Sequence, residues 1–221
     1  MPNKRAFIFA NGELPDNGWL TTAFSTADIL IAADGGLRHL QTLGIPAHLL
    51  IGDLDSVSAD QVDWARANGA KVERYPVAKN ETDLELALLA ARKLGCQEIL
   101  VIAGLGGRLD QTLANLSLLR LPELRDCVVR FEDGREEVFL IHDHALIEGQ
   151  AGDIVSLLPF GAPVEGVITE NLAYPLRHET LYPEHTRGIS NVMNSQQARI
   201  SIASGELLCV HTHHQNSLKE E

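Results

Sequence analysis

Short apolar runs that end in carboxylates or glycines recur through the first half of this 221-residue chain. The run 29–33 leads directly into Asp34, and the run 49–51 leads into Asp53 across a single glycine. A third run, 99–103, leads into a glycine-rich turn. Apolar runs that alternate with helical patterns are typical of the buried strands of a parallel sheet. Loops at the carboxyl ends of such strands form the ligand-binding edge of the sheet, so we expect an acidic site there.

Helical patterns with recognisable ends lie between these runs. Ser58 has the position of an N-cap, Thr82 and Glu85 match a capping box, and Gly95 is a typical helix stop. Repeated β-α units of this length imply a mostly parallel, open sheet with helices on its faces. The expected helices cover residues 37–43, 59–68, 82–94 and 111–119, and the expected strands cover 6–10, 29–33, 49–51, 72–75 and 99–103.

The pattern changes near Pro122, where helical signals stop and short β-like runs separated by turn residues begin. These runs cover residues 127–131, 138–141, 145–147, 154–158, 164–168, 198–203 and 207–211. We therefore expect an α/β plus all-β protein, in which an N-terminal, mostly parallel, open α/β sheet is followed by a C-terminal β-sandwich. The expected domains are residues 1–125 and 126–213, with a frayed tail at 214–221.

Composition narrows the class of protein. The chain has 18 basic and 30 acidic residues and a formal net charge of −12, which disfavours broad contact with nucleic acid, because phosphate backbones require a basic face. No apolar stretch approaches the length of a membrane helix, and the first apolar run is too short for a signal-peptide core. The chain has three cysteines without metal-type spacing, Cys96, Cys127 and Cys209. We expect these cysteines to act as small apolar residues in a reducing compartment, and we therefore expect a cytoplasmic protein.

The acidic residues of the first half are candidates for a metal site. Asp53 and Asp55 are two apart, and in an extended segment both would point to the same side, toward one cation. A solvated Asx turn is the alternative for this pair. Asp83 lies in the first turn of an expected helix, where a carboxylate also complements the helix dipole. Lys79, just upstream, could reach a phosphate oxygen or could be an ordinary solvated lysine.

Two glycine-containing turns have the composition of anion sites. Asp34 is followed by Gly35 and Gly36 at a strand-to-helix junction, where backbone N–H groups are available to an anion. The turn at 104–107 is followed by Arg108, a possible bidentate phosphate ligand, with Asp110 as its orienting partner or as a helix cap. Neither turn is a Walker A loop or a G-x-G-x-x-G fingerprint. Together with the carboxylates, these turns favour magnesium and a polyphosphate.

Taken together, these motifs resemble those of the thiamine pyrophosphokinase family. The matching segments are Ala33–Gly36, Gly52–Ser56, Thr82–Asp83, Gly106–Gln111 and, more weakly, Leu172–Leu176 and Gly188–Asn191. The resemblance implies an ATP-binding α/β domain, a β-sandwich that binds thiamine, a requirement for Mg²⁺, and a homodimer with thiamine sites between the subunits. It also implies transfer of the terminal pyrophosphoryl group of ATP to the thiamine hydroxyl, with release of AMP.

The resemblance also implies roles for individual residues. The expected catalytic residues are Asp53, Asp55, Asp83 and Arg108, and the first three are the expected metal ligands. The expected ATP-binding residues are Asp34, Gly35, Gly36, Lys79, Thr82, Gly106, Gly107, Arg108 and Asp110. The expected thiamine-binding residues are Gln111, Ser190 and Asn191. The chain departs from the family pattern in having no tryptophan near its C-terminus and in having Glu170 and Asn171 before Leu172, where a glycine is often found.

Three other functions remain open at this point. They are a related pyrophosphokinase for another hydroxymethyl heterocycle such as a pterin, a non-catalytic nucleotide sensor, and a metal-dependent phosphohydrolase. Among the residues outside the motifs, Tyr174 and Tyr182 could stack on an aromatic substrate or pack in the β-rich half. His211, His213 and His214 could form a metal cluster, but we expect ordinary exposed histidines.

Overall fold

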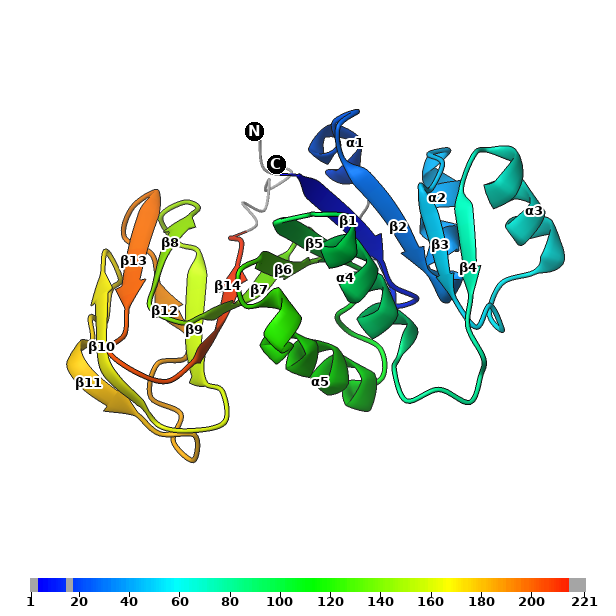
Figure 1. Ribbon diagram of the computed structural model, residues 1–221. Coiled ribbons are helices and arrows are strands. Elements are labelled where there is room, and N and C mark those ends of the chain that lie inside the picture. The colour runs from blue at the N-terminus through cyan, green and yellow to red at the C-terminus, as the bar shows by residue number, and fades with distance from the viewer. Residues whose placement is uncertain (1–3, 15–17, 215–221) are drawn as a thin grey trace, which may run out of the picture. The chain divides into compact units, whose positions relative to one another are not determined.

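The computed structural model describes residues 4–14 and 18–214 and divides into two compact units, Met1–Gly134 and Arg135–Glu221 (Figure 1). Of the expected frayed tail, residue 214 is described and residues 215–221 lie outside the described part of the chain. No helix in the described ranges is long and apolar enough to span a bilayer. All three cysteines are described and are free thiols; Cys96 and Cys209 are buried and Cys127 is half-buried.

The first unit is built on a parallel sheet with strand order β6-β5-β1-β2-β3-β4, in which every neighbouring pair is parallel. Its strands are β1 (Arg5–Phe9), β2 (Ile29–Ala33), β3 (Leu49–Gly52), β4 (Lys71–Arg74), β5 (Glu98–Ile102) and β6 (Val128–Glu132). This order confirms the expected parallel α/β sheet. The run at 127–131, which was expected to open the β-sandwich, instead forms β6 beside β5.

Helices connect these strands in the order that the sequence predicts. They are α1 (Leu20–Ala23), α2 (Leu37–Leu43), α3 (Ala59–Ala67), α4 (Asp83–Lys93) and α5 (Leu109–Ser117), with short 3₁₀ turns η1 (Asp34–Gly36), η2 (Leu118–Arg120) and η3 (Pro122–Leu124). Ser58 and Gln61 form a complete capping box at α3, and the Thr82 hydroxyl caps α4 by accepting the Glu85 N–H. The short helix α1 was not expected.

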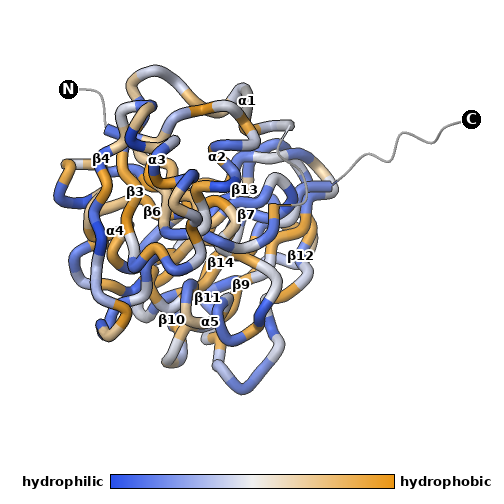
Figure 2. Tube along the Cα trace, turned by 90° about the vertical axis from the view of Figure 1, so that its right-hand side faces the viewer, coloured by the Kyte–Doolittle hydropathy of each residue, from blue (hydrophilic) through white to orange (hydrophobic). Residues whose placement is uncertain are grey.

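The core of the first unit lies where the apolar strands meet the apolar faces of the helices. Phe7, Phe9 and Leu50 are fully buried, as are Leu88 of α4 and Leu40 of α2. Figure 2 shows the tube largely hydrophobic along β3 and alternating between hydrophobic and hydrophilic residues along α4. A strand covered on both faces and a helix covered on one face produce these two patterns.

The second unit is the expected β-sandwich. One antiparallel sheet has the order β12-β9-β14-β7 and the other has the order β11-β10-β13-β8. The strands are β7 (Glu136–Ile141), β8 (His144–Glu148), β9 (Ile154–Pro159), β10 (Val164–Glu170), β11 (Arg177–Leu181), β12 (Asn191–Val192), β13 (Gln197–Ser201) and β14 (Leu207–Thr212). Buried residues of both sheets, such as Leu157, Val167 and Ile200, form a common core. The half-exposed β11 and the two-residue β12 were not expected.

The expectation of exposed histidines at the end of the chain is wrong for His211, which is fully buried. Leu207 and Cys209 are buried as well, and residues two apart in a strand share a face. The alternation therefore places His211 on the interior face of β14. His213 is half-buried and His214 is exposed.

Candidate active site

A cavity of about 770 Å³ in the first unit opens at the carboxyl ends of β1, β2, β3 and β5. Its wall is formed by the loops that follow these strands and by the start of α4. The chain proceeds from β1 to β2 on one side and from β5 to β6 on the other, so β1 and β5 flank the topological switch point. Open α/β sheets bind their ligands at such a point, because the loops diverge there and leave a crevice.

Three carboxylates converge in this cavity, each from a different element. Asp34 follows β2, Asp53 follows β3 and Asp83 begins α4, and one oxygen from each lies within 4.8 Å of the others. Asp34 and Asp53 are buried, and the Asp34 Oδ1 atom has no hydrogen-bond partner among the described residues. A buried carboxylate oxygen without a donor is costly unless a cation compensates it. The donor set, which consists of oxygens only, is the set that Mg²⁺ prefers.

Lys79 supplies the positive charge nearest to these carboxylates. Its Nζ atom lies 2.8 Å from Asp53 Oδ2 and 3.0 Å from Asp83 Oδ1. The hydrogen bond from Lys79 is the main cause that holds the pKa of Asp53 below its usual range. Burial raises the pKa of Asp83 and outweighs the opposing effect of Lys79. The ammonium group therefore contacts two of the three carboxylates, and the three together keep an excess of negative charge.

A glycine makes this convergence possible. Gly52 has φ 149°, and a Cβ atom there would lie 3.0 Å from Asp83 Cγ and 3.1 Å from Asp34 Cβ. Asp34 itself has φ 47°, in the left-handed region that residues other than glycine rarely adopt. Backbone strain of this kind persists where the surrounding structure imposes it, and it concentrates at functional sites.

Asp55 is separated from the three converging carboxylates. Leu54 has φ 64°, so the segment turns instead of extending, and Asp55 is exposed. The expectation that Asp53 and Asp55 point to one side of an extended segment is therefore wrong. The alternative Asx turn forms instead, since the Asp55 N–H donates to Asp53 Oδ1 at 3.2 Å. Asp55 nevertheless lines the same cavity, and its Oδ1 atom accepts a hydrogen bond from Ser56.

The glycine-rich turn after β5 forms another part of the cavity wall. Gly106 and Gly107 have φ values of 75° and 69°, and Arg108 is exposed at the cavity rim. Arg108 pairs with Asp110 through two hydrogen bonds, from Nε to Oδ1 at 3.1 Å and from Nη2 to Oδ2 at 2.6 Å. This pairing holds the pKa of the Asp110 carboxyl below its usual range. Asp110 therefore orients the guanidinium group and does not itself line the cavity.

Other residues expected to bind ATP differ in their surroundings. Thr82 and Gln111 line the cavity. Gly35 and Gly36 are buried and do not line it. A Cβ at Gly35 would clash with the Asn11 side chain, and a Cβ at Gly36 would clash with the Phe9 carbonyl oxygen. These two glycines allow η1 to pass close to β1.

Sequence reasoning missed the loop after β1 and the arginine that holds it. Asn11 and Gly12 line the cavity, and Arg38 of α2 donates to their carbonyl oxygens at 3.0 and 2.6 Å. Asn115 of α5 donates to the Gly104 carbonyl oxygen at 2.8 Å and so ties the helix to the glycine-rich turn. The loop after β1 could have been found, because it follows an apolar run just as the other three loops do.

The two remaining expected site residues belong to the second unit. Ser190 and Asn191 line a cavity of about 200 Å³ there, together with Tyr174 and Ile189. Asn191 is buried and forms a two-bond clamp with the Tyr174 backbone, accepting its N–H at 2.9 Å and donating to its carbonyl oxygen at 2.7 Å. Tyr174 is 64% exposed, so its ring is available to a ligand and is not packed in the core. Ser190 has φ 54°, and its N–H donates to Ser156 Oγ.

Comparison with known proteins agrees with the organisation in two units. A family model described as the catalytic domain of thiamin pyrophosphokinase matches residues 20–129, and a model described as its vitamin B1 binding domain matches residues 143–207. The chain belongs to the thiamine pyrophosphokinase family. Members of this family are ATP-dependent pyrophosphotransferases that form thiamine diphosphate, and this activity is the one expected from the motifs.

Individual thiamine pyrophosphokinases resemble this chain over most of its length. The enzyme from Bacillus subtilis (strain 168) is 25% identical over 182 residues, which is 81% of this chain and 85% of the relative. Thiamine pyrophosphokinase 1 of Oryza sativa subsp. japonica is 26% identical over 224 residues, covering 89% of this chain and 83% of the relative. The other functions considered for the sequence are not favoured by these matches.

Solved structures of thiamine pyrophosphokinases have the same fold. The Bacillus subtilis crystal structure superimposes with a TM-score of 0.85 at 25% identity, covering 96% of this chain and all of the other. Thiamin pyrophosphokinase from Candida albicans superimposes with a TM-score of 0.84 at 16% identity, covering 96% of this chain and 90% of the other. The fold is thus retained where few residues are shared.

Proposed function

We propose that this protein forms thiamine diphosphate and AMP from thiamine and ATP in the cavity at the carboxyl ends of β1, β2, β3 and β5, with Mg²⁺ held by Asp34, Asp53 and Asp83. The observation that carries the proposal is the convergence of three carboxylates within 4.8 Å, one of them with a buried oxygen that lacks a donor. When bound, the ion would neutralise charge on the phosphate oxygens. Asp55 is proposed to act beside these ligands, on the same cavity wall.

Cationic side chains around the carboxylates are proposed to hold the polyphosphate. Arg108 lies at the rim with its guanidinium oriented by Asp110, which suits a bidentate contact with phosphate oxygens. Lys79 contacts Asp53 and Asp83 and can exchange one of these partners for a phosphate oxygen. The backbone N–H groups of Gly106 and Gly107, in a turn with positive φ, add donors of the kind that bind anions.

The chemistry requires positioning more than covalent help from the protein. The thiamine hydroxyl oxygen attacks the β-phosphorus of ATP, the bond from that phosphorus to the oxygen shared with the α-phosphate breaks, and AMP leaves with that oxygen. The hydroxyl proton passes to a carboxylate. We assign this role to Asp55, because it is exposed in the cavity whereas Asp34 is buried among the proposed metal ligands. Holding both reactants in line supplies most of the acceleration.

The thiamine site is proposed to include Gln111, Ser190 and Asn191. Ser190 and Asn191 fall within the segment matched by the vitamin B1 binding model, and they line a cavity beside the exposed ring of Tyr174. We propose that Tyr174 stacks on the thiamine, a role suited to an exposed aromatic ring in a chain with no tryptophan near its C-terminus. We further propose a homodimer with thiamine sites between the subunits, in the cytoplasm.

One assay tests the reaction. AMP and thiamine diphosphate are measured from ATP and Mg²⁺, with and without thiamine. We expect thiamine-dependent AMP in equal amount to thiamine diphosphate. Formation of AMP with a hydroxymethyl pterin but not with thiamine would show that the pterin is the acceptor. Release of phosphate without any acceptor would indicate a phosphohydrolase. Binding of Mg-ATP without AMP from any acceptor would indicate a nucleotide sensor.

A further inference from the structure

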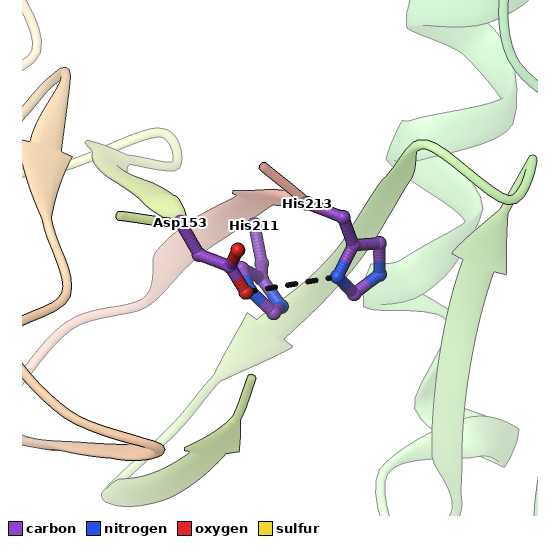
Figure 3. Close-up of side chains that lie close together, drawn as sticks. All are labelled: Asp153, His211 and His213. Atoms are coloured by element: carbon purple, nitrogen blue, oxygen red, sulfur yellow. Dashed lines mark hydrogen bonds and ion pairs between the residues drawn. The ribbon is translucent and has the colours of Figure 1, made fainter. Parts of the chain in front are cut away.

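A second cluster of metal-ligating side chains lies in the β-sandwich and takes no part in the proposed reaction. Asp153 directly precedes β9, His211 lies near the end of β14, and His213 directly follows that strand (Figure 3). One ligand atom from each of the three side chains lies within 4.8 Å of the others. The three side chains point toward one another in Figure 3, with the Asp153 carboxylate beside both rings.

The distances between these atoms are near those of a metal site. Asp153 Oδ2 lies 2.9 Å from His211 Nε2 and 3.8 Å from His213 Nδ1. Ligands that each stand about 2.0–2.2 Å from a tetrahedral ion are separated by roughly 3.3–3.6 Å. An ion on His211 Nε2 would replace the proton of its hydrogen bond to Asp153, and these two atoms would move apart by about half an ångström. The 3.8 Å separation to His213 is too long for a hydrogen bond, and the His213 ring is positioned by an edge-to-face contact with the His211 ring, at 4.5 Å between centroids.

The carboxylate is fixed before any ion binds. Asp153 is fully buried, and it accepts the Gln150 N–H at 3.0 Å on Oδ2 and the His214 N–H at 2.8 Å on Oδ1. Gly149 lies directly against the pair, since a Cβ there would be 2.3 Å from Asp153 Oδ2 and 2.9 Å from His211 Nε2. The first ligand is thus preorganised, and a metal would not have to order it.

The second nitrogen of His211 faces a carboxylate outside the cluster. His211 is fully buried, and its Nδ1 atom has no hydrogen-bond partner among the described residues. Glu137, its partner across β7 and β14, places an Oε2 atom 3.7 Å from that nitrogen. A histidine that binds metal through one nitrogen usually donates the other N–H to a carboxylate, which sets the tautomer and strengthens the ligand. Glu137 stands where that outer carboxylate belongs.

We propose that Asp153, His211 and His213 form a structural binding site for a divalent transition-metal ion, with Zn²⁺ as the expected occupant. Two imidazole nitrogens and one carboxylate oxygen suit Zn²⁺, whereas Mg²⁺ prefers the all-oxygen set of the first unit. His213 is 37% exposed, so water has access to a fourth position. A bound ion would tie the end of β14 to the start of β9 and stabilise the sandwich.

The test measures zinc in the full chain, purified without a histidine tag and stripped with a chelator. Zinc per chain, the visible absorption of bound Co²⁺ and the zinc-dependent rise in Tm are compared among variants. His213→Ala removes the half-exposed ligand, and His214→Ala is the matched control, because only its backbone contacts the cluster. Wild type and His214→Ala should bind about one Zn²⁺ per chain, with a tetrahedral Co²⁺ spectrum and a raised Tm.

His213→Ala should remain folded but bind zinc at least about 100-fold more weakly. Asp53→Ala, which alters the first unit, should keep the zinc site and its Co²⁺ spectrum. The proposal fails if the wild type binds no zinc, if His213→Ala binds it as tightly as His214→Ala, or if Asp53→Ala abolishes binding. None of these readouts depends on formation of thiamine diphosphate, so the site can fail while the proposed function stands, and the reverse.

Discussion

At the scale of single residues, the proposed active site depends on carboxylates that are distant in sequence. Asp34, Asp53 and Asp83 come from three separate elements, and Lys79 is the ammonium group that contacts two of them. Like charges held this close repel one another unless a cation compensates them. Removing one acid should therefore lessen the need for Mg²⁺ to compensate the negative charge, whereas removing the lysine should increase it.

Asp53→Ala should abolish turnover and leave the fold intact. Asp53 contacts Lys79 and is a proposed metal ligand, so its loss weakens both metal and phosphate binding. We expect a fall in kcat/KM of about 10³-fold or more, with circular dichroism and Tm close to those of the wild type. Asp63→Ala, an exposed acid on α3, is the control and should keep full activity. Normal turnover in folded Asp53→Ala would remove the assignment.

Lys79→Met should make the stability of the first unit depend on Mg²⁺. The variant leaves Asp53 and Asp83 without the ammonium that lies 2.8 and 3.0 Å from them. In a chelator we expect its Tm to fall by about 4 °C or more, and Mg²⁺ should restore much of that loss. The measurement is thermal unfolding with and without Mg²⁺. An equal Tm in both conditions would contradict a metal site at these carboxylates.

At the scale of elements, the turns at strand ends decide which side chains meet. β3 ends at Gly52, which lies against Asp34 and Asp83, and the turn that follows has Leu54 with positive φ. This conformation separates Asp55 from Asp53. The start of β1 is held differently, by an ion pair between Arg5 and the buried Asp28. Changes at the end of β3 should affect catalysis, whereas changes in the ion pair of Arg5 and Asp28 should affect stability.

Gly52→Ala should lower activity much more than stability. Its Cβ would press on Asp83 and Asp34, while the unfavourable backbone conformation itself costs about 1 kcal/mol. Gly69→Ala is the matched control, because Gly69 also has positive φ but no atom within 4 Å of the added carbon. Unfolding in urea should show similar losses for both variants. We expect a fall in kcat of roughly 10²-fold for Gly52→Ala alone; equal activities would show that the cavity tolerates the displacement.

Asp28→Asn should destabilise the first unit in a pH-dependent way. Burial by itself would raise the pKa of Asp28, but hydrogen bonds from Arg5 and the Ser25 N–H outweigh it and hold this pKa below its usual range. A lowered pKa contributes stability above the unfolded-state value of about 3.9, and this contribution is lost as the pH falls through the folded-state pKa. At pH 7 we expect a loss of about 1–3 kcal/mol in the free energy of unfolding.

The difference between wild type and Asp28→Asn should be constant near neutral pH and shrink below about pH 4. Urea unfolding at several pH values measures it. The exposed residue Asp126, changed to Asn, serves as the control and should cost less than about 0.5 kcal/mol at pH 7. A loss for Asp28→Asn that does not change between pH 7 and pH 3 would show that the ion pair is not its cause.

At the scale of the whole molecule, the chain combines two units with different chemistry. The parallel sheet ends in an all-oxygen acidic cavity, whereas the β-sandwich carries the nitrogen and oxygen cluster of Asp153, His211 and His213. The proposed thiamine residues Ser190 and Asn191 also belong to the β-sandwich, and the proposed phosphate residues belong to the parallel sheet. The proposed function therefore assigns roles to residues of both units.

A homodimer is the expected state of the protein in solution. Exposed Tyr174 and Ile189 beside the proposed thiamine cavity are apolar groups that a partner subunit would cover. Light scattering at micromolar concentration should give twice the mass of the chain. Ile189→Asp should weaken this dimer and reduce thiamine-dependent turnover together, while the exposed Leu94→Asp in the first unit should change neither. A monomer of full activity would contradict the proposal.

The sequence by itself determined the order of strands and helices, because apolar periodicity and capping residues act locally. It also identified the strand-end acids and the family. It did not separate Asp55 from the carboxylates that converge, since that depends on the positive φ of Leu54 and on the strand order that brings Asp34 beside Asp53.

Burial and long-range pairing were decided by the tertiary structure. The run at 127–131 contributes to β6, which pairs in parallel with β5, and His211 is buried because it shares a face with Leu207 and Cys209. The pairing of His211 with Asp153 spans 58 residues, and no local pattern encodes it. Local patterns specify what each segment forms, and only packing specifies which side chains meet.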